Sequence, residues 1–122
     1  MCGIAGVVAL AGAIADADAS AVAAMAGALA HRGPDGLGSR RDERCVLANT
    51  RLKVTDLSER GALPMSNEAD TVWLGYNGAI TNHRQLKARH RLGDKYKFQS
   101  ASDSEVLLRL YEDRGQIGRA HV

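Results

Sequence analysis

The start of the chain places a nucleophile directly before a strand. Cys2 follows the initiator methionine, and residues 4–10 form a short, apolar, partly β-branched run that predicts a buried strand. Removal of Met1 would leave Cys2 with both a thiol and a free α-amine. An α-amine has an unperturbed pKa of about 7.7–8, so it can serve as general base for the thiol of the same residue. The alternative interpretation is a cysteine that is merely small and buried.

The composition indicates one small soluble domain. The chain has 122 residues, 45% hydrophobic and 25% charged. A net charge of +2 is too small to favour nucleic acid or an anionic membrane as a partner. Cys2 and Cys45 provide no disulfide framework, which favours a cytoplasmic location. No Lys or Arg precedes the first apolar run, and Asp16 and Asp18 interrupt the alanine-rich stretch after it, so we expect neither a signal peptide nor a membrane span.

The first half of the chain predicts a helix and a hairpin after the first strand. A helix is expected over about residues 19–31, capped by Asp18 or Ser20 and ended by Gly33-Pro34. Its inner face is predicted to carry Val22, Met25, Ala26 and Leu29. Strands at 37–41 and 44–52 flank a turn at Asp42-Glu43, and the second strand is apolar on both faces, so we expect it to be covered on both sides.

The second half predicts shorter elements. Residues 56–67 form a long loop, followed by a strand at 71–76, a short helix from Asn82 to about residue 90 and a strand at 96–99. Ser102 and Glu105 have the spacing of a capping box and open a helix that Gly115 ends. The inner face of that helix is predicted to carry Val106, Leu107, Leu110 and Tyr111. Short strands that alternate with amphipathic helices favour an α+β fold, with sheets covered by helices.

Five segments, in this order and at this spacing, resemble the glutamine-hydrolysing half of the class II glutamine amidotransferases, most closely the asparagine synthetase branch. They are Met1-Cys2-Gly3-Ile4, His31-Arg32-Gly33-Pro34-Asp35-Gly36, Arg51-Leu52 with Asp56-Leu57-Ser58, Tyr76-Asn77-Gly78 with Asn82, and Ser102-Asp103-Ser104-Glu105. The resemblance implies an α+β N-terminal nucleophile hydrolase fold, a four-layer αββα sandwich of two sheets between two helical layers. Residues 1–116 would then be an incomplete type-2 amidotransferase domain, truncated at its C-terminus.

The resemblance also implies the activity. The chain would be the glutaminase half of a glutamine-hydrolysing asparagine synthetase, releasing ammonia from L-glutamine through a Cys2 thioester for the ATP-dependent amidation of aspartate. It would need no cofactor itself, whereas a C-terminal synthetase domain in cis would use ATP and Mg²⁺. We expect the segment alone to be weakly active or inactive, and a homodimer of the full-length protein is one possible assembly. The alternatives are an amidotransferase with another acceptor and a non-catalytic domain.

The implied site has five residues. Cys2 is the nucleophile, and Asn77 and Gly78 would donate N–H groups to the oxyanion, although Asn-Gly is also typical of a tight turn. Arg51 would bind the glutamine α-carboxylate through two parallel hydrogen bonds, and its alternative is a solvated strand-end arginine. Asp103 would bind the α-ammonium group, and its alternative is a carboxylate stabilised by a helix dipole.

Further motif residues have no chemical step of their own. His31, Arg32, Gly33 and Asp35 belong to the second segment, where they either buttress the pocket by polar contacts or form a helix end and turn. We expect no metal site, because Cys2, His31 and Cys45 contain no ligand pair at metal spacing, and Cys45 is expected in the core.

Three positions depart from the family pattern, and the end of the chain is unusual. Ala79 stands where the synthetases usually carry Glu, which removes one glutamine anchor, and Leu63 and Thr81 replace a commoner Gln and an aromatic residue. Residues 117–122 can be encoded by a common sequencing-adapter oligonucleotide. We therefore expect them to be a non-native tail that packs on nothing.

Overall fold

The computed structural model describes the backbone of residues 1–54 and 56–120 and side chains up to residue 115. The chain forms two compact units, which are described separately. The first combines Met1–Lys53, Ala62–Pro64 and Gly75–Gly78, and the second combines Val54–Gly61, Met65–Leu74 and Ala79–Val122. Both units mix helices with small sheets, which confirms the α+β class. In the described part of the chain, no helix has the length and apolar character that a membrane span requires.

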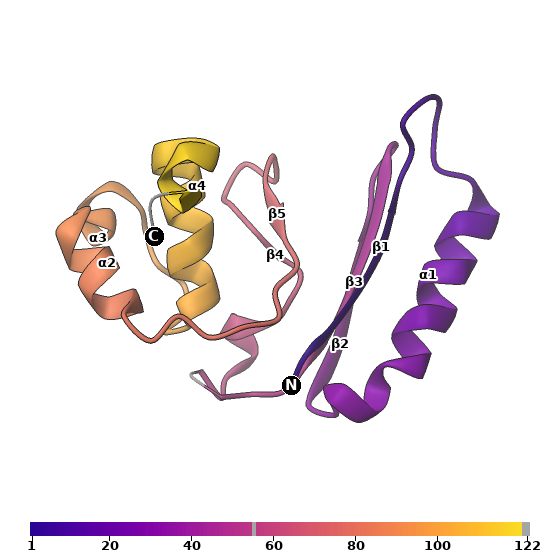
Figure 1. Cartoon of the computed structure of the whole chain (residues 1–122), viewed down its shortest axis with the longest axis horizontal. Helices are drawn as coiled ribbons and strands as arrows, with labels where there is room; N and C mark the ends of the chain where they lie inside the picture. The colour runs from indigo at the N-terminus through magenta and orange to yellow at the C-terminus, as the bar shows by residue number, and fades with distance from the viewer. Residues whose placement is uncertain (55, 121–122) are drawn as a thin grey trace. The chain divides into compact units, whose positions relative to one another are not determined.

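The first unit is built on a three-stranded antiparallel sheet in the order β1-β3-β2 (Figure 1). Its strands are β1 (Gly3–Val8), β2 (Gly36–Arg41) and β3 (Cys45–Arg51). In the register, Gly3 lies opposite Thr50, and Gly36 lies opposite Arg51. The central strand β3 therefore ends beside the start of both neighbours. The predicted hairpin is confirmed, and its turn is closed by the Asp42 carboxylate, which accepts the backbone N–H groups of Arg44 and Cys45 at 2.8 Å.

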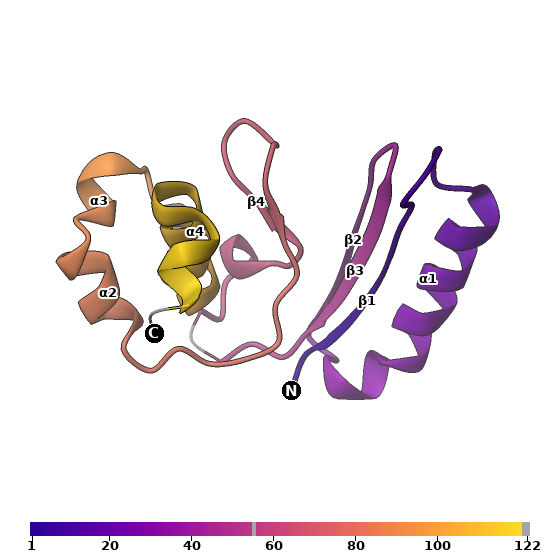
Figure 2. The same ribbon diagram turned by 45° about the horizontal axis from the view of Figure 1, so that its top comes forward.

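Helix α1 (Asp16–Ala28) covers one face of this sheet (Figures 1 and 2). Val22 and Ala26 are buried in a common core with residues of β1 and β3. Met25, however, is 43% exposed, so its predicted place on the inner face is wrong. The helix begins at Asp16, so the predicted cap Asp18 lies within the first turn. Its carboxylate accepts the N–H of Ala15 at 3.2 Å. It ends earlier than predicted and gives way to a short 3₁₀ helix, η1 (Ala30–Arg32).

The described part of the second unit contains three α-helices, a short 3₁₀ helix and a two-stranded antiparallel sheet (Figure 1). Its elements are η2 (Glu59–Gly61), β4 (Met65–Ser66), β5 (Trp73–Leu74), α2 (His83–Arg89), α3 (Leu92–Lys95) and α4 (Asp103–Ala120). Its core contains Leu92, Val106 and Leu110, packed against partly buried residues of α2 and of the loop before α4. The expected strand at 71–76 is thus only two residues long.

The strand predicted at 96–99 is wrong. The helix α3 at residues 92–95 precedes this stretch, and residues 96–99 are irregular and take part in no sheet of the described structure. The backbone N–H of Gln99 and that of Ser100 both bind the Glu105 carboxylate, at 2.9 and 2.7 Å. A buried carboxylate on α4 thus takes the place of a strand partner, and a local apolar pattern does not reveal such an acceptor.

Helix α4 begins as predicted. Ser102 Oγ accepts the N–H of Glu105 at 3.3 Å, as the capping box requires. The Glu105 carboxylate does not complete the box, because it binds Gln99 and Ser100. Gly115 has φ 62° and ψ −156°, which are not helical values, so the regular helix that starts at Asp103 is interrupted there as predicted, and a second helical stretch follows the kink. The expectation that residues 117–122 pack on nothing lies outside the described residues.

The inward face of α4 differs from the prediction by one position. Leu108 is 1% exposed, whereas Leu107 is only half-buried and Tyr111 is 45% exposed. Arg109 is also buried, and its guanidinium pairs with Glu112 at 3.0 Å and Glu105 at 3.7 Å. The ion pairs with neighbouring helical turns allow a charged side chain to occupy this face, which a hydrophobic pattern cannot anticipate.

We predict that Leu108→Ala lowers the free energy of unfolding by about 2–5 kcal/mol, because it leaves a cavity in a fully buried site. Leu107→Ala is the matched control on the same helical turn and should cost at least about 1 kcal/mol less, because its side chain is partly exposed. Urea denaturation followed by circular dichroism measures both. A larger loss for Leu107→Ala would contradict the observed face of α4.

Candidate active site

Cys2 lies directly before β1 and is held against the end of β3. The backbone N–H of Leu52 donates to Cys2 Sγ at 3.3 Å, and the thiol lies 3.9 Å from the Leu52 carbonyl oxygen. The next residue, Gly3, donates its N–H to Thr50 Oγ1 at 2.9 Å. Cys2 is partly exposed, its sulfur contacts the backbone of Leu52, and the backbone of the next residue is held by Thr50.

Gly3 permits this close approach. A Cβ atom at this position would lie 2.8 Å from Thr50 Oγ1 and 2.9 Å from Leu29 Cβ, closer than side chains pack. The glycine therefore lets the backbone beside Cys2 lie against β3 and the end of the α1 segment.

Arg51 is the last residue of β3 and is 6% exposed. This burial excludes the alternative of a solvated strand-end arginine. Its carbonyl oxygen accepts the N–H of Asp35 at 3.0 Å, and the Asp35 carboxylate accepts the N–H of Lys53 at 2.9 Å. Because Leu52 separates Arg51 from Lys53, these bonds fix the backbone on both sides of the residue that contacts Cys2 Sγ.

The segment around η1 makes two kinds of contact. Arg32 Nε donates to the Cys2 carbonyl oxygen at 3.3 Å, so this residue and Asp35 touch the segments that carry Cys2 and Arg51. His31 Nδ1 lies 3.0 Å from the Ala28 carbonyl oxygen, a contact with the helix end. Gly33 is buried where a Cβ would collide with the amide nitrogen of Arg51.

Asn77 and Gly78 are exposed and lie in an irregular segment. They were expected at a strand end, but β5 ends at Leu74. In the described structure they form no turn, which excludes the tight-turn alternative. The segment is instead tied to β3 by a side chain: the N–H of Tyr76 donates to Asn49 Oδ1 at 2.7 Å.

Asp103 lies in the second unit, as the first residue of α4, and is 6% exposed. Its Oδ2 accepts the N–H of Ile80 at 2.8 Å, and its Oδ1 accepts the N–H of Ser104 at 3.0 Å. The carboxylate therefore accepts backbone N–H groups at the start of a helix. This position fits the alternative role, a carboxylate stabilised by the helix dipole. Cys2, Arg51, Asn77 and Gly78, by contrast, all belong to the first unit.

A family model described as "Glutamine amidotransferase domain" matches residues 1–121. The chain belongs to this family. The resemblance that the sequence motifs indicated is thereby confirmed.

Several asparagine synthetases are similar to the domain. Over 85 residues, which is 70% of this chain, it is 44% identical to asparagine synthetase B [glutamine-hydrolyzing] of Escherichia coli. Over 116 residues, or 95% of this chain, it is 40% identical to asparagine synthetase [glutamine-hydrolyzing] 2 of Oryza sativa subsp. japonica and 39% identical to asparagine synthetase [glutamine-hydrolyzing] of Zea mays. The matched parts span 15–19% of the length of these relatives.

Two buried polar residues outside the motifs, Asn49 and Thr50, bind the segments that carry the candidate site residues. Asn49 is 0% exposed and holds the segment of Asn77, whereas Thr50 is 2% exposed and holds Gly3. The available signal was a pair of polar residues within a strand predicted to be covered on both sides. Buried polar side chains need hydrogen-bond partners, so such a pair indicates polar contacts on both faces.

The remaining candidates in the amidotransferase domain have other surroundings. Cys45 is half-buried, and burial followed by the charge of Asp42 raises the pKa of its thiol. Leu63 is buried in the first unit, whereas Ala79 and Thr81 are exposed in the second. In the described part of the chain, no group of three or more His, Cys, Asp and Glu side chains could hold a metal ion.

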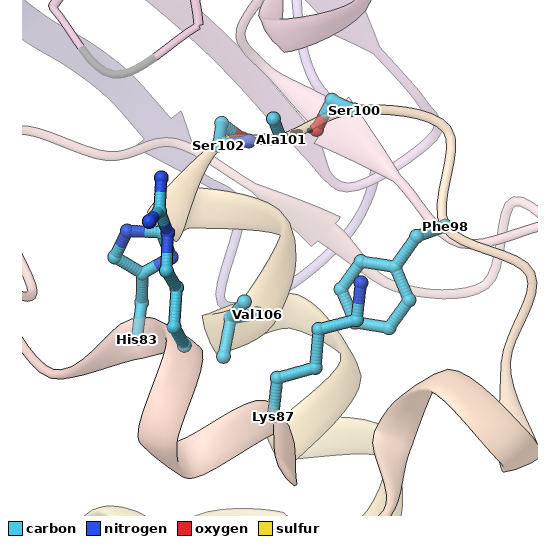
Figure 3. A pocket seen from close by; sticks show the side chains of 8 residues that line it. His83, Lys87, Phe98, Ser100, Ala101, Ser102 and Val106 are labelled. Carbon is cyan, nitrogen blue, oxygen red and sulfur yellow. Dashed lines mark hydrogen bonds between the residues drawn. The ribbon is translucent and has the colours of Figure 1, made fainter.

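The second unit of the amidotransferase domain has a hollow of about 290 Å³ between α2 and the loop before α4 (Figure 3). His83 and Lys87 of α2 lie on one side of it and Ser100 and Ser102 on the other, and Lys87 Nζ lies 3.9 Å from the centre of the Phe98 ring. None of the predicted glutamine-site residues lines this hollow.

We predict that Gly33→Ala lowers the free energy of unfolding by about 1–3 kcal/mol, because the added Cβ collides with the backbone of β3. Gly36→Ala is the matched control in the same motif, since its Cβ would make only an ordinary 3.9 Å contact with Arg51 Cβ. Thermal unfolding of the two variants beside the unmodified chain tests this. Equal melting temperatures for both variants would disprove the close approach of Gly33 to β3.

Proposed function

We propose that this chain is the glutaminase part of a glutamine-hydrolysing asparagine synthetase. The observation that carries the proposal is the position of Cys2, whose Sγ receives the Leu52 N–H within the unit that also holds Arg51, Asn77 and Gly78. Family membership supports the reaction class, and the names of the relatives support the branch.

The reaction begins once Met1 has been removed and the Cys2 α-amine is free. The amine takes the thiol proton, and the sulfur attacks the side-chain amide carbon of glutamine. The tetrahedral oxyanion accepts N–H groups from the Asn77 side chain and the Gly78 backbone. The C–N bond then breaks, the amine returns a proton to the leaving group, and ammonia departs. Water cleaves the resulting thioester, which releases glutamate and restores the thiol.

Two charged residues would select glutamine by its backbone groups. Arg51 would bind the α-carboxylate through its guanidinium, whose planar shape matches two carboxylate oxygens. Asp103 would bind the α-ammonium group with an oxygen that also accepts backbone N–H groups, because each carboxylate oxygen has two lone pairs. Ala79 offers no carboxylate, so Asp103 would be the anionic anchor, and we expect glutamine affinity to depend strongly on it.

The larger context is also part of the proposal. Residues 1–116 would be part of a four-layer αββα sandwich, which is supported by a helix-covered sheet in one unit and by helices with a small sheet in the other. A synthetase domain in cis would use ATP and Mg²⁺ to activate aspartate for the released ammonia. Another acceptor is the second candidate, since that domain selects it. The protein would be cytoplasmic, and the full-length form could be a homodimer.

We predict that Cys2→Ala abolishes glutamine hydrolysis, with a loss of more than about a thousandfold. The assay measures glutamate release by the protein expressed from its complete reading frame. Cys45→Ala is the matched control, because it removes the other thiol and should keep the rate within about threefold, an estimate for a side chain that takes no part in the chemistry. Equal rates for the unmodified protein and Cys2→Ala would refute the nucleophile assignment and favour a non-catalytic domain.

A further inference from the structure

We infer that Asn49 is a positioning residue that fixes the oxyanion donors Asn77 and Gly78 in register with Cys2. The inference rests on the proposed function and extends it to a residue outside every recognised motif. Asn49 lies on β3, two residues before Arg51, and is completely buried.

Both ends of the Asn49 side-chain amide are used. Its Oδ1 accepts the N–H of Tyr76 at 2.7 Å, and its Nδ2 donates to the Thr50 carbonyl oxygen at 2.8 Å. A backbone N–H requires an acceptor and a carbonyl oxygen requires a donor, so these partners determine which end of the amide is oxygen. The side chain is thus locked in one orientation.

The anchored amide directly precedes Asn77 in the chain. Strand β5 has already ended at Leu74, so its ladder does not extend to this segment. Leu47, which lies two residues before Asn49 along β3, contacts Gly75, where a Cβ would come 3.0 Å from Leu47 Cδ1. The segment therefore rests on β3 at two consecutive residues, Gly75 and Tyr76, just before the exposed donors.

The same strand fixes the nucleophile. Thr50 Oγ1 accepts the Gly3 N–H, and the amide of Leu52 reaches Cys2 Sγ. Asn49 and Thr50 are consecutive residues, so their side chains point to opposite faces of the sheet. One holds the oxyanion segment and the other holds the segment of Cys2. The relative placement of nucleophile and donors is therefore set within two residues of one strand.

Such placement affects the transition state more than substrate binding. Oxyanion donors stabilise charge only when they lie about 2.7–3.1 Å from the developing oxyanion, and a displacement of about 1 Å can cost roughly a hundredfold in rate. Neither Asn49 nor Tyr76 N–H would touch the glutamine α-groups in this scheme. Loss of the anchor should thus lower kcat and leave KM for glutamine nearly unchanged.

The test compares three variants of the protein expressed from its complete reading frame. Asn49→Leu removes both hydrogen bonds, and Asn49→Asp keeps an acceptor for the Tyr76 N–H. Asn67→Leu is the matched control: Asn67 is 7% exposed and accepts two backbone N–H groups in the second unit, from Thr71 and Val72. Glutamate release gives kcat and KM, and thermal unfolding reports stability.

We expect Asn49→Leu to lower kcat about a hundredfold with KM within about threefold, and Asn49→Asp to lose less than about tenfold. Asn67→Leu should destabilise the protein and keep kcat. If Asn49→Leu and Asn67→Leu have equal kcat values, Asn49 has only a structural role and the inference is overturned. If Asn49→Leu does not fold, a hundredfold loss in a folded Asn49→Asp overturns it as well. Absence of Cys2-dependent hydrolysis in the unmodified protein is a separate result, which removes the proposed function itself.

Discussion

The hydrogen bonds made by the buried polar end of β3 determine the arrangement of the first unit. Asn49, Thr50 and Arg51 are consecutive and at most 6% exposed. Burying an amide, a hydroxyl or a guanidinium is costly unless its polar atoms are bonded. For Asn49 and Thr50, the segments that contain Tyr76 and Gly3 supply those bonds. The hydrogen bonds that satisfy these buried side chains therefore also position the segments that carry the residues proposed for the chemistry.

The segment between α1 and β2 supports the same strand end from another direction. Arg32 bonds the Cys2 carbonyl, and Asp35 bonds the backbone on both sides of Leu52. Gly33 lies so close to the β3 backbone that no larger residue fits. This segment therefore holds the backbone in place and supplies no reacting group. Arg32, Gly33 and Asp35 all contact the chain near the point where Leu52 meets Cys2.

Much of this could be predicted where local pattern and tertiary environment agree. The β2–β3 hairpin and the start of α4 directly after Ser102 follow from turn and capping residues, and the family follows from short motifs in order. The misses all involve polar side chains and their bonding partners. Glu105 draws the nearby Gln99 and Ser100 away from a strand, and Arg109 enters a buried face because Glu105 and Glu112 lie on neighbouring helical turns. Asn49 binds Tyr76, 27 positions away. A hydrophobic pattern does not report such polar partners, whether they are near or far in sequence.

The most direct test of the central role of β3 is amide hydrogen exchange, measured by NMR on the unmodified chain. The N–H groups of Gly3, Leu52 and Tyr76 donate to Thr50 Oγ1, Cys2 Sγ and Asn49 Oδ1. Because two of these acceptors belong to buried side chains, the Gly3 and Tyr76 amides should be protected to a degree similar to the β1–β3 ladder. Exchange of Tyr76 as fast as that of the exposed residues Asn77 and Gly78 would show that β3 does not hold this segment, and the account would fail.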